Sequence, residues 1–236
     1  MKALIIISGV DGSGKTTLAN HLAMHYHSPG YLKSKLSNQS MFGLKEDQLA
    51  LRYALDFLRE RMNLLEERLD HPSAIFDASV YEDLIRLKLM ADLGFIASKE
   101  VDQYAQNIHY RIKQLPFQRA QNTQHLFVYL NLSFEEMLSR KLAEKTNYHH
   151  FLHTPILYEY YKELHRRYQL WFERYSCLPK FSVEVNQYDL HDPKDIQKLA
   201  QKLAQKIQQI LTTTEPIHLT TEKLIANVEQ GIFQIN

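Results

Sequence analysis

The sequence predicts an α/β fold in which a parallel sheet of about five strands is covered by helices on both faces. Short apolar runs rich in β-branched residues, such as residues 3–8 (ALIIIS), alternate with longer segments whose apolar residues recur at helical spacing. The first run leads directly into a glycine-rich loop, and ligands of such sheets bind at the carboxyl ends of the strands. We expect one domain over residues 1–211, followed by a polar tail over residues 212–236.

Each element follows from its local pattern. Strands are expected at residues 3–8, in a run that ends at Asp77, at 125–132 and at 181–185, with a short strand at 30–36. Helices are expected over residues 15–27, 45–69, 80–93, 99–115, 133–145, 155–174 and 193–211. The helix over 155–174 carries an aromatic stripe, which we interpret as core packing or a dimer face. Gly9 and Asp77 follow the first two strands, so both should lie at the ligand edge of the sheet.

Composition excludes several classes of protein. The net charge is +1 over 236 residues, so a broad surface for nucleic acid or membrane is not expected. Lysines recur every fourth residue from Lys194 to Lys206, which is typical of one solvated helix face. The single cysteine, Cys177, excludes a disulfide framework and suits a reducing cytoplasm, where we expect the protein.

The loop GVDGSGKTT contains the most specific motif. Gly9, Gly14, Lys15 and Thr16 complete the pattern Gly-four-any-Gly-Lys-Ser/Thr, a P-loop, between a strand and a helix as the motif requires. Backbone N–H groups of such a loop and the following helix terminus surround phosphates. Lys15 should reach the β- and γ-phosphates of ATP, and the Thr16 hydroxyl should ligate Mg²⁺. The nucleotide-binding residues are therefore expected to be Gly9, Gly12, Ser13, Gly14, Lys15, Thr16 and Thr17.

Asp77 supplies the acid that phosphoryl transfer needs near the metal, because it closes the strand SAIFD beside the loop. The sequence lacks the Asn-Lys-x-Asp of guanine-specific GTPases. A chain of this size with helices between its strands favours a small-molecule kinase.

The stretch DASVYEDLIRLKLMADLGFIASKEVDQYAQNI, residues 77–108, resembles the deoxynucleoside kinase family, especially bacterial deoxyadenosine and deoxyguanosine kinases. Residues FVYLNLSFEEMLSRK, YYKELHRRYQLWFERY and FSVEVNQYDL extend the resemblance over about residues 3–210. It implies a P-loop fold and ATP- and Mg²⁺-dependent transfer to a deoxynucleoside, with purines favoured. It also implies a homodimer or a heterodimer with a paralogous subunit.

The resemblance carries over at single positions. Asp77 matches the acid near the metal, and Asp83 matches an acid near the base. Arg61 matches an arginine on the substrate side. Arg140 matches the start of a nucleotide-binding lid over about residues 140–153. His149 aligns with a sugar-contacting position.

The acceptor side departs from the family pattern. Residues 28–45 contain no carboxylate where the family has a general base, Ala78 replaces an arginine, and residues 144–146 read Glu-Lys-Thr where the lid reads Arg-Gly-Arg. In a nucleoside kinase, Asp11 or Asp77 would have to take the proton. Lys33 and Lys35 instead suit a monophosphate acceptor, and DGSGKTT resembles thymidylate kinases locally. A degenerate, non-catalytic nucleotide-binding or partner subunit is the third interpretation.

Overall fold

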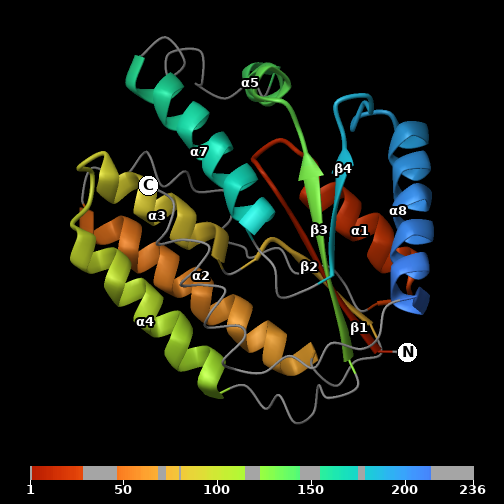
Figure 1. Ribbon diagram of the computed structural model, residues 1–236, viewed down its shortest axis with the longest axis horizontal. Helices are drawn as coiled ribbons and strands as arrows, with labels where there is room; N and C mark the ends of the chain where they lie inside the picture. The colour runs from red at the N-terminus through yellow and green to blue at the C-terminus, as the bar shows by residue number, and fades with distance from the viewer. Residues whose placement is uncertain are drawn as a thin grey trace.

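The computed structural model describes residues 2–28, 47–68, 73–79, 81–114, 123–143, 155–174 and 179–213. Within them the sheet has four parallel strands, in the order β2-β1-β3-β4 (Figure 1). The strands are β1 (Lys2–Gly9), β2 (Ser73–Asp77), β3 (Thr123–Asn131) and β4 (Lys180–Glu184). The parallel α/β fold is thus confirmed, whereas the fifth strand expected at residues 30–36 lies outside the described residues.

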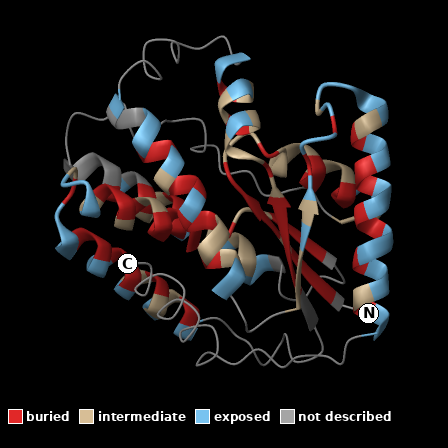
Figure 2. Cartoon of the chain, turned by 45° about the horizontal axis from the view of Figure 1, so that its top comes forward, coloured by how far each residue is buried: buried red, intermediate tan, exposed pale blue. Residues whose placement is uncertain are grey.

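The two central strands carry the core. Ile5 and Ile7 of β1 are fully buried, as are Phe127 and Val128 of β3, because helices cover both faces of these strands (Figure 2). Strand β4 at the edge of the sheet has only partly buried or exposed residues. This difference explains why β1 reads as a continuous apolar run and β4 does not.

Helices form a layer on each face of the sheet (Figure 1). Helices α1 (Lys15–His25) and α8 (Pro193–Thr213) pack against each other on one face, where the Tyr26 hydroxyl donates to the Ala204 carbonyl at 3.2 Å. The other face is covered by α2 (Asp47–Arg68), α3 (Tyr81–Asp92) and α7 (Pro155–Arg174), and α4 (Ser98–Gln114) packs against α2 and α3 on the side away from the sheet. Helix α5 (Phe134–Ala143) follows β3 at the carboxyl ends of the strands.

The aromatic stripe of α7 packs mainly into the core. Trp171 is fully buried and meets Phe127 of β3 edge to face, with ring centroids 5.1 Å apart. Tyr160, Tyr161 and Tyr168 are also buried. The expectation of core packing is confirmed for these residues.

Strand register brings the first two strand ends together. Ile7 of β1 pairs with Asp77 of β2, so β2 ends level with the start of the loop that leaves β1. The first turn of α1 and the last residue of β2 therefore lie side by side. None of the helices in the described ranges is long and apolar enough to cross a membrane.

Candidate active site

The loop between β1 and α1 has the conformation that its glycines permit. Gly12 and Gly14 have φ of +77° and +88°, in the left-handed region that favours glycine. A Cβ at Gly9 would lie 2.7 Å from the Leu130 carbonyl oxygen, and one at Gly14 would collide with the Leu190 side chain. Gly14 is the N-cap of α1, so the first N–H groups of the helix open onto the loop. The sequence motif thus forms an anion-binding turn.

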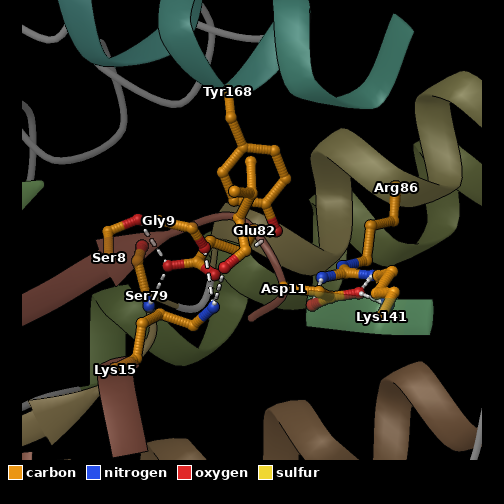
Figure 3. A network of polar contacts seen from close by, with 10 residues as sticks. Ser8, Gly9, Asp11, Lys15, Ser79, Glu82, Arg86, Lys141 and Tyr168 are labelled. Carbon is orange, nitrogen blue, oxygen red and sulfur yellow. Dashed lines mark hydrogen bonds and ion pairs between the residues drawn. The ribbon is translucent and has the colours of Figure 1, made fainter. Parts of the chain in front are cut away.

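The side chains of the loop are held close to the backbone. Lys15 Nζ donates to the carbonyls of Gly9 at 2.6 Å and Val10 at 3.0 Å (Figure 3). Ser13 is fully buried beneath the loop. The Lys15 ammonium is therefore already inside the loop, where phosphate oxygens would replace the carbonyls as its partners. Thr17 follows in the first turn of α1.

Thr16 and Asp77 form the contact expected of a magnesium site. Thr16 Oγ1 donates to Asp77 Oδ2 at 2.5 Å across the gap between α1 and β2. Hydroxyl and carboxylate oxygens are ligands that Mg²⁺ accepts, and Mg²⁺ keeps several waters and takes few protein ligands. No cluster of three or more His, Cys, Asp or Glu side chains that could hold a metal occurs in the described ranges. The donors thus fit Mg²⁺ bound together with phosphates.

Ala78, next to Asp77, has a left-handed backbone with φ of +75°. Its N–H donates to the Ile7 carbonyl at 2.9 Å, which ties the turn after β2 to β1. This conformation is unfavourable for a residue with a Cβ. The strained backbone of Ala78 therefore directly follows Asp77, the acid expected near Mg²⁺.

Glu82 is a buried acid under the loop that sequence reasoning missed. Glu82 Oε1 accepts hydrogen bonds from Ser8 Oγ at 2.6 Å and from the Ser79 N–H at 3.1 Å. Glu82 Oε2 accepts one from the Tyr168 hydroxyl at 3.3 Å (Figure 3). Burial raises the pKa of Glu82, and the charge of Lys15 and these hydrogen bonds offset only part of that effect. Glu82 thereby joins the end of β1 to α3 and α7.

Asp11, the third residue of the loop, is bound by two cations. Arg86 Nη2 lies 2.6 Å from Asp11 Oδ1, and Lys141 Nζ lies 3.4 Å from Oδ2 (Figure 3). Burial alone would raise the pKa of Asp11, but the charges of Arg86, Lys141 and Lys15 outweigh it and hold that pKa well below its usual range. Such a carboxylate is a poor proton acceptor at neutral pH, so the structure argues against Asp11 as the substitute general base.

Arg61 and Asp83, both expected on the substrate side, meet between α2 and α3. Arg61 Nη1 lies 2.6 Å from Asp83 Oδ2, with 14% and 11% of their side chains exposed, and the Tyr104 hydroxyl donates to the same oxygen at 3.2 Å. Burial would lower the pKa of Arg61, but the charge of Asp83 raises it overall. The pair therefore presents a guanidinium donor beside a carboxylate acceptor.

Arg140 has a structural environment that the sequence did not reveal. Its guanidinium donates to the Gly12 carbonyl at 3.0 Å and to the Val185 and Tyr188 carbonyls at 3.2 Å, while Nε donates to Glu136 at 2.8 Å. These bonds fasten the phosphate loop to α5 and to the segment after β4. Whether Arg140 also contacts a nucleotide stays a prediction.

Three expected substrate residues, Lys33, Lys35 and His149, lie outside the described residues, as do residues 144–153 of the expected lid. The residues that sequence reasoning missed are Glu82, Arg86 and Lys141. Glu82 resembles an ordinary helix-start acid, since acids are favoured in a first turn. The spacing of Asp83 and Arg86, three residues apart, was the available signal that one face of α3 is charged.

Comparison with known proteins gives the family. The family model described as deoxynucleoside kinase matches residues 5–211. Over 188 residues the chain is 28% identical to a deoxyguanosine kinase of Lactobacillus johnsonii, covering 79% of this chain and 84% of that protein. It is 24% identical over 200 residues to a deoxyadenosine kinase of Lactobacillus acidophilus, covering 84% and 93%.

Solved structures agree with this fold. A deoxyadenosine kinase from M. mycoides, determined with dCMP and dCDP bound, superposes with a TM-score of 0.63 at 19% identity, over 86% of this chain and 99% of that one. A thymidylate kinase from Candida albicans has a TM-score of 0.54 at 17% identity, over 92% and 96%. Since the family model spans nearly the whole folded region, the chain belongs to the deoxynucleoside kinase family.

Proposed function

We propose that this kinase transfers the γ-phosphoryl group of ATP, with Mg²⁺, to the sugar hydroxyl of a purine deoxynucleoside. The observation that carries the proposal is the hydrogen bond between Thr16 and Asp77 at 2.5 Å beside a complete phosphate loop. That arrangement supplies the donor half of a phosphoryl-transfer site. The curated relatives, named deoxyguanosine and deoxyadenosine kinases, support the purine acceptor.

On the donor side, the loop N–H groups and Lys15 bind the phosphates, and Thr16 and Asp77 hold Mg²⁺. Bound Mg²⁺ would neutralise charge on the β- and γ-phosphate oxygens. Lys15 already lies inside the loop, so its ammonium needs no large movement to reach them. Arg140 acts as a positioning residue, because its bonds to Gly12 and the segment after β4 fix the shape of the loop.

On the acceptor side, Arg61 and Asp83 read the base. A guanidinium beside a carboxylate offers a hydrogen-bond donor next to an acceptor. This matches the edges of purine bases, which carry both acceptors and donors. Tyr104 donates to Asp83 and fixes the orientation of its carboxylate. Without a base, Arg61 and Asp83 bond each other, so neither charge is left unpaired in a largely buried place.

Transfer to the acceptor hydroxyl can proceed without a dedicated general base, at a reduced rate. Phosphoryl transfer proceeds through a loose transition state, in which positioning and charge stabilisation supply most of the catalysis. A dedicated base typically contributes about 10²–10⁴-fold, so an enzyme with no strong base would be slower but active. Asp77 is the remaining candidate among the residues singled out as possible bases.

One screen tests the proposal. ATP and Mg²⁺ are incubated with each common deoxynucleoside and each deoxynucleoside monophosphate, and product is measured for wild type and Asp77→Asn. Transfer to deoxyguanosine or deoxyadenosine that needs Mg²⁺ and Asp77 supports the proposal. Transfer only to monophosphates would replace it with a monophosphate kinase, and ATP binding without transfer would leave a non-catalytic subunit. Dimer formation and a cytoplasmic location stay predictions, for mass measurement in solution and cell fractionation.

A further inference from the structure

Asp11 is an acid inside a loop whose other features attract anions. It lies between Gly9 and Gly14, and the charge of Lys15 acts on its carboxyl. An uncompensated carboxylate at this position would repel every phosphate that enters the loop. The fold must therefore cancel that charge for a triphosphate to bind.

Arg86 of α3 supplies the compensation. Its two terminal nitrogens engage both carboxylate oxygens, Nη2 to Oδ1 at 2.6 Å and Nη1 to Oδ2 at 3.3 Å (Figure 3). This forked geometry is specific to arginine and fixes the plane of the carboxylate. The guanidinium carbon of Arg86 also lies 5.8 Å from the ring centroid of Tyr168, so packing from α7 holds the cation in place.

Lys141 adds a second cation from α5. Only 6% of its side chain is exposed, and its ammonium lies 4.8 Å from the ring centroid of Tyr161. Asp11 thus joins the loop to α3 through Arg86 and to α5 through Lys141. The forked contact of Arg86 is the shorter of the two and dominates the compensation.

We infer that Arg86 is a positioning residue of the phosphate site, which cancels the charge of Asp11 and turns its carboxylate toward α3 so that a nucleoside triphosphate can occupy the loop. The inference rests on the proposed function, since it assumes that a triphosphate binds there. It assigns Asp11 to holding the loop against α3 instead of to proton transfer.

This role has a signature that packing alone does not have. If Arg86 is removed, the unmasked carboxylate repels a ligand in proportion to the ligand's charge. The loss of affinity should therefore increase from AMP to ADP to the triphosphate. A single charge at about 10 Å in an effective dielectric of about 20 changes a binding constant by roughly tenfold or more. Simple loss of packing would weaken all three ligands to a similar degree.

The experiment measures dissociation constants by calorimetry for AMP, ADP and the non-hydrolysable analogue adenylyl imidodiphosphate. Arg86→Met should weaken the analogue by about tenfold or more, ADP less, and AMP least. Asp11→Asn/Arg86→Met should recover most of the affinity, because it removes the repelling acid as well. Arg86→Lys, which keeps the charge, should lose less than Arg86→Met. Arg166→Met is the matched control and should leave binding unchanged, since Arg166 also binds a carboxylate through two nitrogens, Nε and Nη2 to Glu163, on the surface of α7.

If Arg86→Met shows no cooperative unfolding transition and is therefore not folded, Asp11→Asn alone tests the inference. It leaves the cations in place and should bind the analogue at least as tightly as wild type, whereas weaker binding would overturn the inference. Equal losses for all three ligands in Arg86→Met, or a double variant no better than the single one, would also overturn it. If wild type binds no analogue at all, the proposed function fails first and the inference falls with it. Wild-type binding with an unaffected Arg86→Met would overturn the inference alone.

Discussion

Thr16 and Asp77 lie 61 residues apart in sequence, yet their side chains share a 2.5 Å hydrogen bond. The bond exists because β1 and β2 are parallel neighbours in register, so the helix after one strand begins beside the last residue of the other. It places a hydroxyl and a carboxylate together at the expected phosphates. The proposed chemistry of the donor side depends on this pair.

Asp77→Asn should lower kcat by at least about 100-fold while changing nucleotide affinity by less than about fivefold, since metal-held charge acts mainly in the transition state. Steady-state kinetics and calorimetry with a non-hydrolysable analogue measure the two quantities. Asp56→Asn, on the exposed side of α2, is the control. Unchanged turnover in Asp77→Asn would place the metal-side acid elsewhere.

Asp83→Ala should destabilise the protein by about 3–5 kcal/mol, because it leaves the largely buried Arg61 cation without its ion-pair partner. The exposed pair Arg59–Asp56 offers a comparison, and Asp56→Ala should cost less than about 1 kcal/mol. Denaturant unfolding gives both values. Arg61→Leu/Asp83→Leu should recover most of the stability but not binding of the acceptor base, and a double variant as unstable as Asp83→Ala would contradict the pairing argument.

Glu82 should make stability depend on pH. Its folded pKa is raised above the ordinary value of 4.5, so the folded state holds this proton more tightly than the unfolded chain does. The resulting stabilisation is complete below pH 4.5 and is lost as the pH rises toward and through the folded pKa. Between the unfolded and folded pKa values, the free energy of unfolding falls by about 1.4 kcal/mol per pH unit. Glu82→Gln should therefore gain free energy of unfolding relative to wild type as the pH rises from 4.5 toward the folded pKa of Glu82. Glu66→Gln, on an exposed position of α2, should show no such trend, and a parallel pair of curves for Glu82→Gln would refute the assignment.

Ala78→Gly should stabilise the protein by about 0.5–1 kcal/mol, because the left-handed conformation costs an L-residue about 1–2 kcal/mol and glycine loses part of that gain in chain entropy. Ala91→Gly, inside α3, should instead destabilise by about 1 kcal/mol. Thermal unfolding of both variants tests the opposite signs. A loss of stability in Ala78→Gly would mean that its Cβ makes contacts worth more than the strain.

The local elements and the contact between Thr16 and Asp77 could be predicted from the sequence, whereas the surroundings of the other candidate site residues could be predicted only in part. The runs around Ile5 and Phe127 are buried on both faces and therefore read as strands, and the loop motif requires a strand before it and a helix after it. Asp77 followed from its place at a strand end. In contrast, the partners of Asp11 come from α3 and α5, and no local pattern reports which surfaces of two distant helices will meet at a loop.

Glu82 shows the same limit from inside the core. Acids are common at the start of a helix, so the sequence Tyr81-Glu82-Asp83 does not show whether Glu82 is buried or exposed to solvent. Its burial follows from Ser8 below it and Tyr168 above it, which are 74 and 86 residues away. Tyr168 packs in the core, as the aromatic stripe predicts, and its hydroxyl also donates to this acid. Only the tertiary structure shows that one side chain both packs in the core and hydrogen-bonds a buried acid.

The bond from Tyr26 to Ala204 has a consequence for how the protein is made. Helix α1 leaves the ribosome well before α8, the helix that shields it, because α1 ends at His25 and α8 begins at Pro193. The phosphate loop precedes α1 directly, so its supporting helix stays uncovered while the residues between α1 and α8 are synthesised. Domains generally fold as units as they emerge, and exposed apolar surface favours aggregation. We expect nascent chains that end before α8 to expose the buried face of α1 and to bind nucleotide only once residues 193–213 have been synthesised.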